Sequence, residues 1–223
     1  MSRNTTFAPG EFYHIYNRGT EKRKIFFNAR DYTRFLALLY LCNGEFPVDL
    51  KRQGSTLSEI LAQDRGESLV DICAYCLMPN HFHLILKEIK EGGISKFMQK
   101  LITGYTMYFN KVYERSGVLF QGKFKSEHAN DDNYLKYLVA YVHLNPVKLV
   151  EPLWREKGVK DKRKAERFLD SYSYSSFRDY CSHDRLEKVI LSMNSLPYYE
   201  TTHAAFRSNV TEWLNGQYAY SVM

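Results

Sequence analysis

The stretch Leu77–Leu86 reads L-M-P-N-H-F-H-L-I-L and determines the fold that we expect for the whole chain. Pro79-Asn80 is a turn signal between two apolar runs, which predicts an antiparallel hairpin. His81 and His83 lie two residues apart in its second strand. Because alternate strand residues point to the same face, the two imidazoles should project side by side. Two neutral imidazoles on one rigid face form half of a metal site, although such a pair more often serves packing.

The segments around this hairpin predict a complete domain. We expect strands at 11–17, 68–78, 81–89 and an extended segment at 118–127, with helices at 29–41 and 92–113 and a short helix at 56–63. This strand-helix-strand-strand-helix-strand order indicates an α+β, ferredoxin-like (RRM-like) fold, in which one antiparallel sheet carries helices on one face. A helix from Asp131 to Leu144, ended by Asn145-Pro146, follows the sixth element.

The composition is that of a globular protein with one sizeable core. The chain has 223 residues, of which 44% are hydrophobic and 25% charged, as in soluble domains. Its apolar runs are too short for a membrane span and its start is no signal peptide, so we expect no membrane partner and a cytoplasmic location. We place one domain at 1–150 and a C-terminal helical extension at 151–223, with a last helix near 202–214.

Cys73 and Cys76 have the C-x-x-C spacing of a zinc knuckle or a redox motif. They lie in an expected strand, where residues i and i+3 face opposite ways, and no second pair lies nearby. We therefore interpret both as buried packing residues.

The positive charge is concentrated in one region. The chain carries a net charge of +6, and residues 96–125 contain six basic residues against one acid, Glu114. Aromatic residues are interleaved with them, a mixture that suits a phosphate backbone with unstacked bases. A solvated helix with its aromatic residues in the core is the alternative. The candidate DNA contacts from this region are Lys111, Arg115, Gln121, Lys123 and Lys125.

The first expected strand supplies two further candidates. His14 lies at its centre and shares a face with Phe12 and Tyr16, so it could support the histidine pair, contact DNA or pack in the core. Arg18, at the end of the strand, is a candidate DNA contact.

The helix at 131–144 carries Tyr134, Tyr137, Tyr141 and Asn145 on one stripe. A core-facing aromatic stripe is one interpretation. In the other, the amide oxygen of Asn145 completes the metal site that the histidines begin, and the phenol of Tyr141 lies beside the metal. A divalent cation can polarise a phosphodiester, and attack by the phenol would leave a covalent phosphotyrosine. Tyr137 is the rival nucleophile, but it is farther from Asn145.

Several blocks of this sequence resemble the single-tyrosine HUH transposases, and most closely the REP-associated tyrosine transposases (RAYT). The blocks are Y-H-I-Y-N-R-G, L-M-P-N-H-F-H-L-I-L, L-F-Q-G-K-F-K-S, Y-V-H-L-N-P-V and Y-S-Y-S-S-F-R-D-Y, and they span about residues 11–180 in the family's order. The resemblance implies a ferredoxin-like nuclease domain that cleaves and rejoins single-stranded DNA near hairpins.

The resemblance also implies roles for single residues. His81 and His83 match the HUH metal ligands, Tyr141 matches the nucleophile, and Asn145 matches the position that completes the metal site, where relatives outside this branch have Gln. The implied metal is Mg²⁺ or Mn²⁺. The implied partner is single-stranded DNA with a hairpin or REP-like sequence, bound at the nucleoid by a monomer or a homodimer. The alternatives are a catalytically inactive, domesticated protein that binds DNA hairpins and a replication-initiator nuclease.

Overall fold

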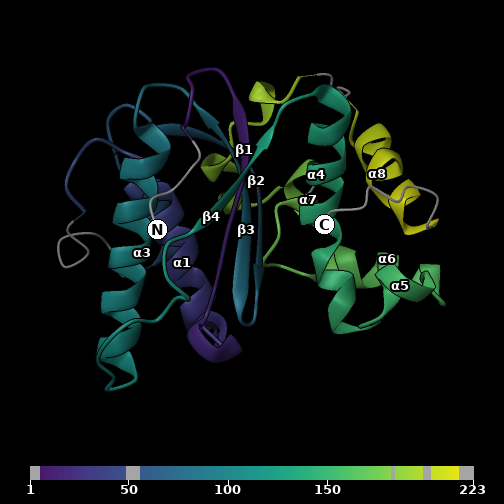
Figure 1. Cartoon of the computed structure of the whole chain (residues 1–223), viewed down its shortest axis with the longest axis horizontal. Coiled ribbons are helices and arrows are strands. Elements are labelled where there is room, and N and C mark those ends of the chain that lie inside the picture. Colours follow the sequence, from purple (N-terminus) through teal and green to yellow (C-terminus); the bar gives the residue numbers. More distant parts are fainter. Residues whose placement is uncertain (1–5, 49–55, 182–183, 198–201, 216–223) are drawn as a thin grey trace.

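The computed structural model describes residues 6–48, 56–181, 184–197 and 202–215 (Figure 1). Its centre is a sheet of the four strands β1 (Phe12–Arg18), β2 (Val70–Met78), β3 (His81–Glu88) and β4 (Lys125–Ala129). The strand order is β2-β3-β1-β4 and each pairing is antiparallel. This is the expected ferredoxin-like arrangement, in which the histidine-bearing strand is central.

Helices α1 (Ala29–Cys42) and α3 (Gly93–Val112) cover one face of the sheet (Figure 1). The short α2 (Leu57–Leu61) packs on α1. The side chain of Asn28 caps α1 by accepting hydrogen bonds from two backbone amides of its first turn. Apolar residues of these helices and of the inner sheet face form one hydrophobic core.

The other face of the sheet is also covered. Helix α4 (Asp132–Leu144), capped by Asp131, packs there with the elements of the C-terminal extension (Figure 1). The remaining elements are η1 (Thr20–Lys22), η2 (Asn145–Leu149), α5 (Trp154–Lys157), α6 (Lys162–Ser171), α7 (Phe177–Tyr180), η3 (Leu186–Ile190), η4 (Met193–Ser195), α8 (His203–Glu212) and η5 (Trp213–Asn215). Buried residues of this layer form a second core against the sheet. None of the helices in the described ranges combines the length and apolar character of a membrane span.

Two local expectations are wrong. The extended segment expected at 118–127 is a strand only from Lys125 onward, because Gly122 has a φ of 71° and its backbone amide closes a turn onto the carbonyl of Phe120. Cys73 and Cys76 do not face opposite ways. The pairing of β2 with β3 shifts register between residues 72 and 74, and this irregularity places both cysteines in the α4-side core. Both are buried and free, as expected of packing residues.

Candidate active site

His81 and His83 lie on β3, in the middle of the sheet, on the face that α4 covers. Their ring centroids are 5.0 Å apart with the planes nearly perpendicular. The cross-strand partner of His81 on β1 is Arg18, and that of His83 is Tyr16. The strand therefore brings the two imidazoles together as its residue alternation predicted.

A hydrogen-bonded chain fixes the orientation of His83. His14 Nε2 lies 2.8 Å from His83 Nδ1, and His14 Nδ1 lies 3.3 Å from an Oε atom of Glu127. The carboxylate can only accept, so His14 donates from Nδ1 and accepts at Nε2 from the Nδ1–H of His83. His83 then carries a lone pair on Nε2. Such a partner on the far ring nitrogen is typical of a metal-binding histidine.

His81 carries its proton on the same ring nitrogen as His83. Its Nδ1 lies 2.6 Å from the side-chain Oδ1 of Asn80, so Nδ1 carries the proton and Nε2 the lone pair. Neither Nε2 atom of the pair makes a hydrogen bond to another described residue. Two lone pairs are therefore available on neighbouring imidazoles.

Burial and nearby cations keep both imidazoles neutral. Burial, with the charges of Arg18, Lys148 and Arg155, lowers the pKa of His81 to about 4. Burial, followed by neighbouring His14, places the pKa of His83 well below its ordinary value. A neutral imidazole is the form that binds a metal ion.

Tyr141, on α4, contacts this histidine cluster directly. Its ring centroid lies 5.5 Å from that of His14 and 5.4 Å from that of His83, edge to face in both cases. On the other side the guanidinium carbon of Arg155 lies 4.0 Å from the centroid of the ring. Tyr137, one turn earlier, packs on Trp213. Tyr141 is half-buried rather than enclosed, and its role as the nucleophile stays a prediction.

Asn145 is buried one turn beyond Tyr141. Its Nδ2 donates to the backbone carbonyl of Tyr141 at 2.9 Å, while its Oδ1 has no hydrogen-bond partner among the described residues. A buried amide oxygen without a partner is destabilising unless a cation or a donor satisfies it. The available lone pairs of His81 and His83 and this oxygen fit an ion that accepts nitrogen and oxygen ligands. Within the described ranges, no three histidine, cysteine or carboxylate side chains gather as a metal cluster, so water or phosphate would have to supply the remaining ligands.

Of the candidate DNA contacts, His14 is a buried member of the histidine cluster, and Arg18 and Lys125 lie next to it. Arg18 is exposed at the end of β1, and Lys125 Nζ lies 6.0 Å from the ring centroid of Tyr16. The backbone amide of Gln121 donates to the carbonyl of Arg18, which keeps the 118–124 segment against this end of β1.

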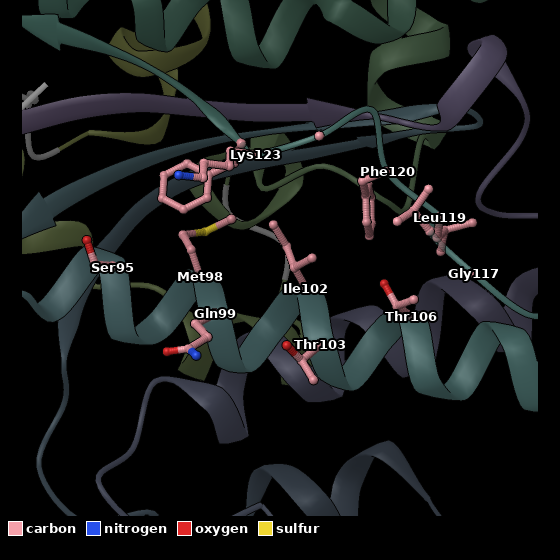
Figure 2. Close-up of a pocket in the computed structure, with 13 residues that line it drawn as sticks. Ser95, Met98, Gln99, Ile102, Thr103, Thr106, Gly117, Leu119, Phe120 and Lys123 are labelled. Carbon is pink, nitrogen blue, oxygen red and sulfur yellow. The ribbon is translucent and has the colours of Figure 1, made fainter. Parts of the chain in front are cut away.

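The other cationic candidates lie across the sheet. Lys111 belongs to α3, and Arg115 follows its end and lies over the ring of Phe109. Lys123 lines an apolar groove of about 780 Å³ between α3 and the 117–124 segment. Figure 2 shows Met98, Ile102 and Thr106 on α3 facing Leu119 and Phe120 across this groove.

Sequence reasoning missed Glu127, Lys148 and Arg155 as parts of the site. Glu127 can be recognised as part of the site only from the register of β4, which pairs it with His14. Lys148 lies in η2 directly after the block Y-V-H-L-N-P-V, and this position was the available signal. Arg155 lies in the charged segment after residue 150, and its contact with Tyr141 depends on how the chain turns back after η2.

Comparison with known proteins identifies the family of this chain. The family model described as "Transposase IS200 like" matches residues 12–145, more than half of the chain. The chain belongs to the IS200-like transposase family. A search of curated proteins found no significant match.

A solved structure of a REP-associated tyrosine transposase bound to a REP hairpin is similar to this IS200-like protein, with a TM-score of 0.50 and 12% sequence identity. The match covers 84% of this chain and 90% of that chain. At this identity the likeness shows a shared fold. The family resemblance and the ferredoxin-like fold inferred from the sequence are both confirmed.

Proposed function

We propose that this IS200-like transposase cleaves and rejoins single-stranded DNA near hairpin, REP-like sequences through a 5′-phosphotyrosine on Tyr141. The observation that carries the proposal is the contact of the Tyr141 ring with His83, whose Nε2 lone pair is held available by His14 and Glu127. Tyr141 lies on the α4 stripe with its ring against those of both His14 and His83. Membership of the family supports a transposase-type enzyme.

The metal ligands in this proposal are His81 and His83 through Nε2 and Asn145 through its unpartnered Oδ1. Bound there, Mg²⁺ or Mn²⁺ would polarise the scissile phosphodiester and stabilise charge on its oxygens. The protein's own part is to hold both imidazoles neutral and fixed in one tautomer.

The chemical step is a transesterification at phosphorus. The Oη atom of Tyr141 forms a bond to phosphorus and gives up its proton to solvent. The bond from phosphorus to the 3′ oxygen breaks, and that oxygen takes up a proton as a free 3′ hydroxyl. Rejoining reverses the step with another 3′ hydroxyl as the attacking group.

We further propose that the DNA contacts are made by Arg18, Gln121 and Lys125 near the site, and by Lys111, Arg115 and Lys123 across the sheet. His14 is buried and both of its ring nitrogens are hydrogen-bonded, so we assign it to the orientation of His83 rather than to a DNA contact. In the same proposal the nuclease domain is 1–150, and the extension at 151–223 packs on or near the DNA-binding face. The packing of α5 and α6 beside η2 supports this placement. The protein acts as a monomer or a homodimer.

The test uses single-stranded DNA that carries the inverted repeats flanking the gene, labelled at the 5′ or the 3′ end. Incubation with Mg²⁺ or Mn²⁺ and denaturing gel electrophoresis should show a metal-dependent covalent adduct in the wild type and none in Tyr141→Phe. Only label on the 3′ side of the cut should move with the protein. An adduct that persists in Tyr141→Phe would transfer the role to Tyr137 or another residue. Hairpin binding without any adduct would make the protein a non-cleaving hairpin binder.

A further inference from the structure

Three cationic side chains surround the histidine–tyrosine site. Arg18 is the cross-strand partner of His81 at the end of β1. Lys148 lies in η2, three residues after Asn145. Arg155, in the first turn of α5, lies on the face of the Tyr141 ring. The three residues belong to three separate elements, so the fold brings them together and no cluster of basic residues in the sequence does.

These cations lack a compensating carboxylate. Within the described residues no ion pair involves Arg18, Lys148 or Arg155, and both arginines are exposed. Burial, and then the charge of Arg155, lower the pKa of Lys148, and Arg18 lowers it further by a smaller amount. Glu156 acts in the opposite direction, more weakly than Arg155 but more strongly than Arg18. Like charges held together without an anion favour the binding of one.

We propose that Arg18, Lys148 and Arg155 form a phosphate clamp that binds the DNA backbone around the cleaved bond, with Arg155 on the scissile phosphate itself. The inference rests on the proposed function, because it takes Tyr141 as the nucleophile. The attacking oxygen must approach phosphorus to about 3–3.5 Å. A guanidinium that already lies on the attacking ring can therefore reach a non-bridging oxygen of the same phosphate. Arginine suits this role because its planar donors match two phosphate oxygens at once.

The chain also contains a matched arginine–tyrosine stack away from the site. The guanidinium carbon of Arg34, on α1, lies 4.9 Å from the ring centroid of Tyr108. Tyr108 is on α3, and its hydroxyl donates to Asp31. If these arginine–tyrosine stacks served only packing, replacing the arginine should have the same effect at both places. Arg34→Gln is therefore the control for Arg155→Gln.

The first measurement is the single-turnover rate of adduct formation at saturating DNA, using the same labelled single strand. Arg155→Gln should reduce the rate constant by about 10²-fold or more, since it removes a donor from developing phosphate charge. Arg155→Lys should recover part of the rate because it restores the charge but not the paired donors. Arg34→Gln should keep the wild-type rate. A wild-type rate in Arg155→Gln would overturn the role of Arg155 and leave the proposed function intact.

The second measurement does not depend on catalysis. Binding of the same single strand to Tyr141→Phe is followed as a function of salt concentration, with and without the triple substitution Arg18→Gln, Lys148→Gln and Arg155→Gln. Each lost phosphate contact should reduce the slope of log affinity against log salt by about 0.7, or about 2 for all three. An unchanged slope would overturn the clamp. A wild type that forms no adduct would defeat the proposed function, while the binding experiment would still decide the clamp.

Discussion

His14 Nε2 lies 2.8 Å from His83 Nδ1, so one imidazole orients the other. The bond links His83 to the carboxylate of Glu127 through His14. Tyr16 also donates to Glu127, at 2.9 Å, and Glu127 therefore remains an acceptor. The pKa of Glu127 is lowered, first by its hydrogen bond with His14. This ionised carboxylate fixes which nitrogen of His83 faces the proposed metal.

Substitution of His14 should weaken metal binding without removing a ligand. His14→Ala frees the Nδ1–H of His83, so the ring loses its preferred tautomer and orientation, and Mn²⁺ affinity should fall by roughly 10–100-fold. The measurement is Mn²⁺ titration by electron paramagnetic resonance, with Tyr141→Phe as the background so that DNA is not cleaved. The control is His128→Ala, which removes a β4 imidazole that bonds to Glu11 instead. Equal Mn²⁺ affinity in His14→Ala and the control would contradict the orienting role.

Much of this site follows from local sequence rules, and the remainder does not. Alternation in β3 and the helical spacing of α4 predict that His81 and His83 share a face and that Tyr141 and Asn145 share another. Those rules involve only residues a few positions apart. The link from Glu127 to His14 depends on strand register, which no local pattern specifies.

The same distinction explains the incorrect expectations. The face of Cys73 was predicted from perfect alternation, but a register shift in β2 changes it. The segment before Lys125 was expected to be extended, although a glycine turn interrupts it. Arg155 comes to lie on Tyr141 because the extension packs its own apolar residues, including Trp154, on the α4-side core. Long-range packing decides that contact.

Metal and DNA should bind the site interdependently. The cations that border the histidine pair oppose a bare divalent ion, and a phosphate neutralises them and can itself supply oxygen ligands. Mn²⁺ affinity of Tyr141→Phe should therefore rise by roughly 5–150-fold when single-stranded DNA is bound. By linkage, Mn²⁺ should raise DNA affinity by the same factor. Titrations of Mn²⁺ with and without DNA, corrected for Mn²⁺ bound by free DNA, measure the coupling, and independent binding would disprove it.

Removing the charge of Arg155 should change that coupling in a defined direction. Arg155→Gln lessens the repulsion of a bare ion, so Mn²⁺ should bind more tightly than to the parent protein when DNA is absent. The increase in Mn²⁺ affinity on adding DNA should be smaller for Arg155→Gln than for the parent protein. Arg34→Gln, on the far layer, should alter neither value. A lower Mn²⁺ affinity of Arg155→Gln without DNA would show that Arg155 supports the metal site structurally rather than opposing the ion.

The buried His143 should make folding stability fall with acidity. Burial lowers its pKa to about 3 from an ordinary 6.5, and its ring bonds to the carbonyl of Val139 and to Ser176. Between these pH values the unfolded chain binds a proton that the folded chain does not. The contribution of neutral His143 to the free energy of unfolding is therefore fully present above pH 6.5. It is lost as pH falls from 6.5 toward 3, and the free energy of unfolding decreases by at most about 1.4 kcal/mol per pH unit.

Urea unfolding at several pH values, compared between wild type and His143→Gln, measures this effect. The variant should be less stable near pH 7, because the core hydrogen bonds are disturbed, but its stability should depend less on pH. Burial raises the pKa of Asp179 to about 6, which acts in the opposite direction, and the comparison cancels it because both proteins retain Asp179. Parallel pH profiles for the two proteins would show that His143 does not titrate on unfolding.

The two layers of the protein should contribute unequally to DNA affinity. Arg18 and Lys125 lie on the β1–β4 side near the histidines, whereas Lys111 and Arg115 lie in the α3 layer across the sheet. A strand that reaches Tyr141 must pass the first pair, but only a longer DNA that extends around the sheet edge can reach the second. For a short single strand, Arg18→Gln with Lys125→Gln should lower the salt slope by about 1.4, and Lys111→Gln with Arg115→Gln should leave it unchanged. With DNA that also carries the hairpin stem, a loss of slope in the second double variant would show that the stem contacts α3. If both double variants lost equal slope with the short strand, the DNA path would have to run over α3, and the placement argued from the histidine site would be wrong.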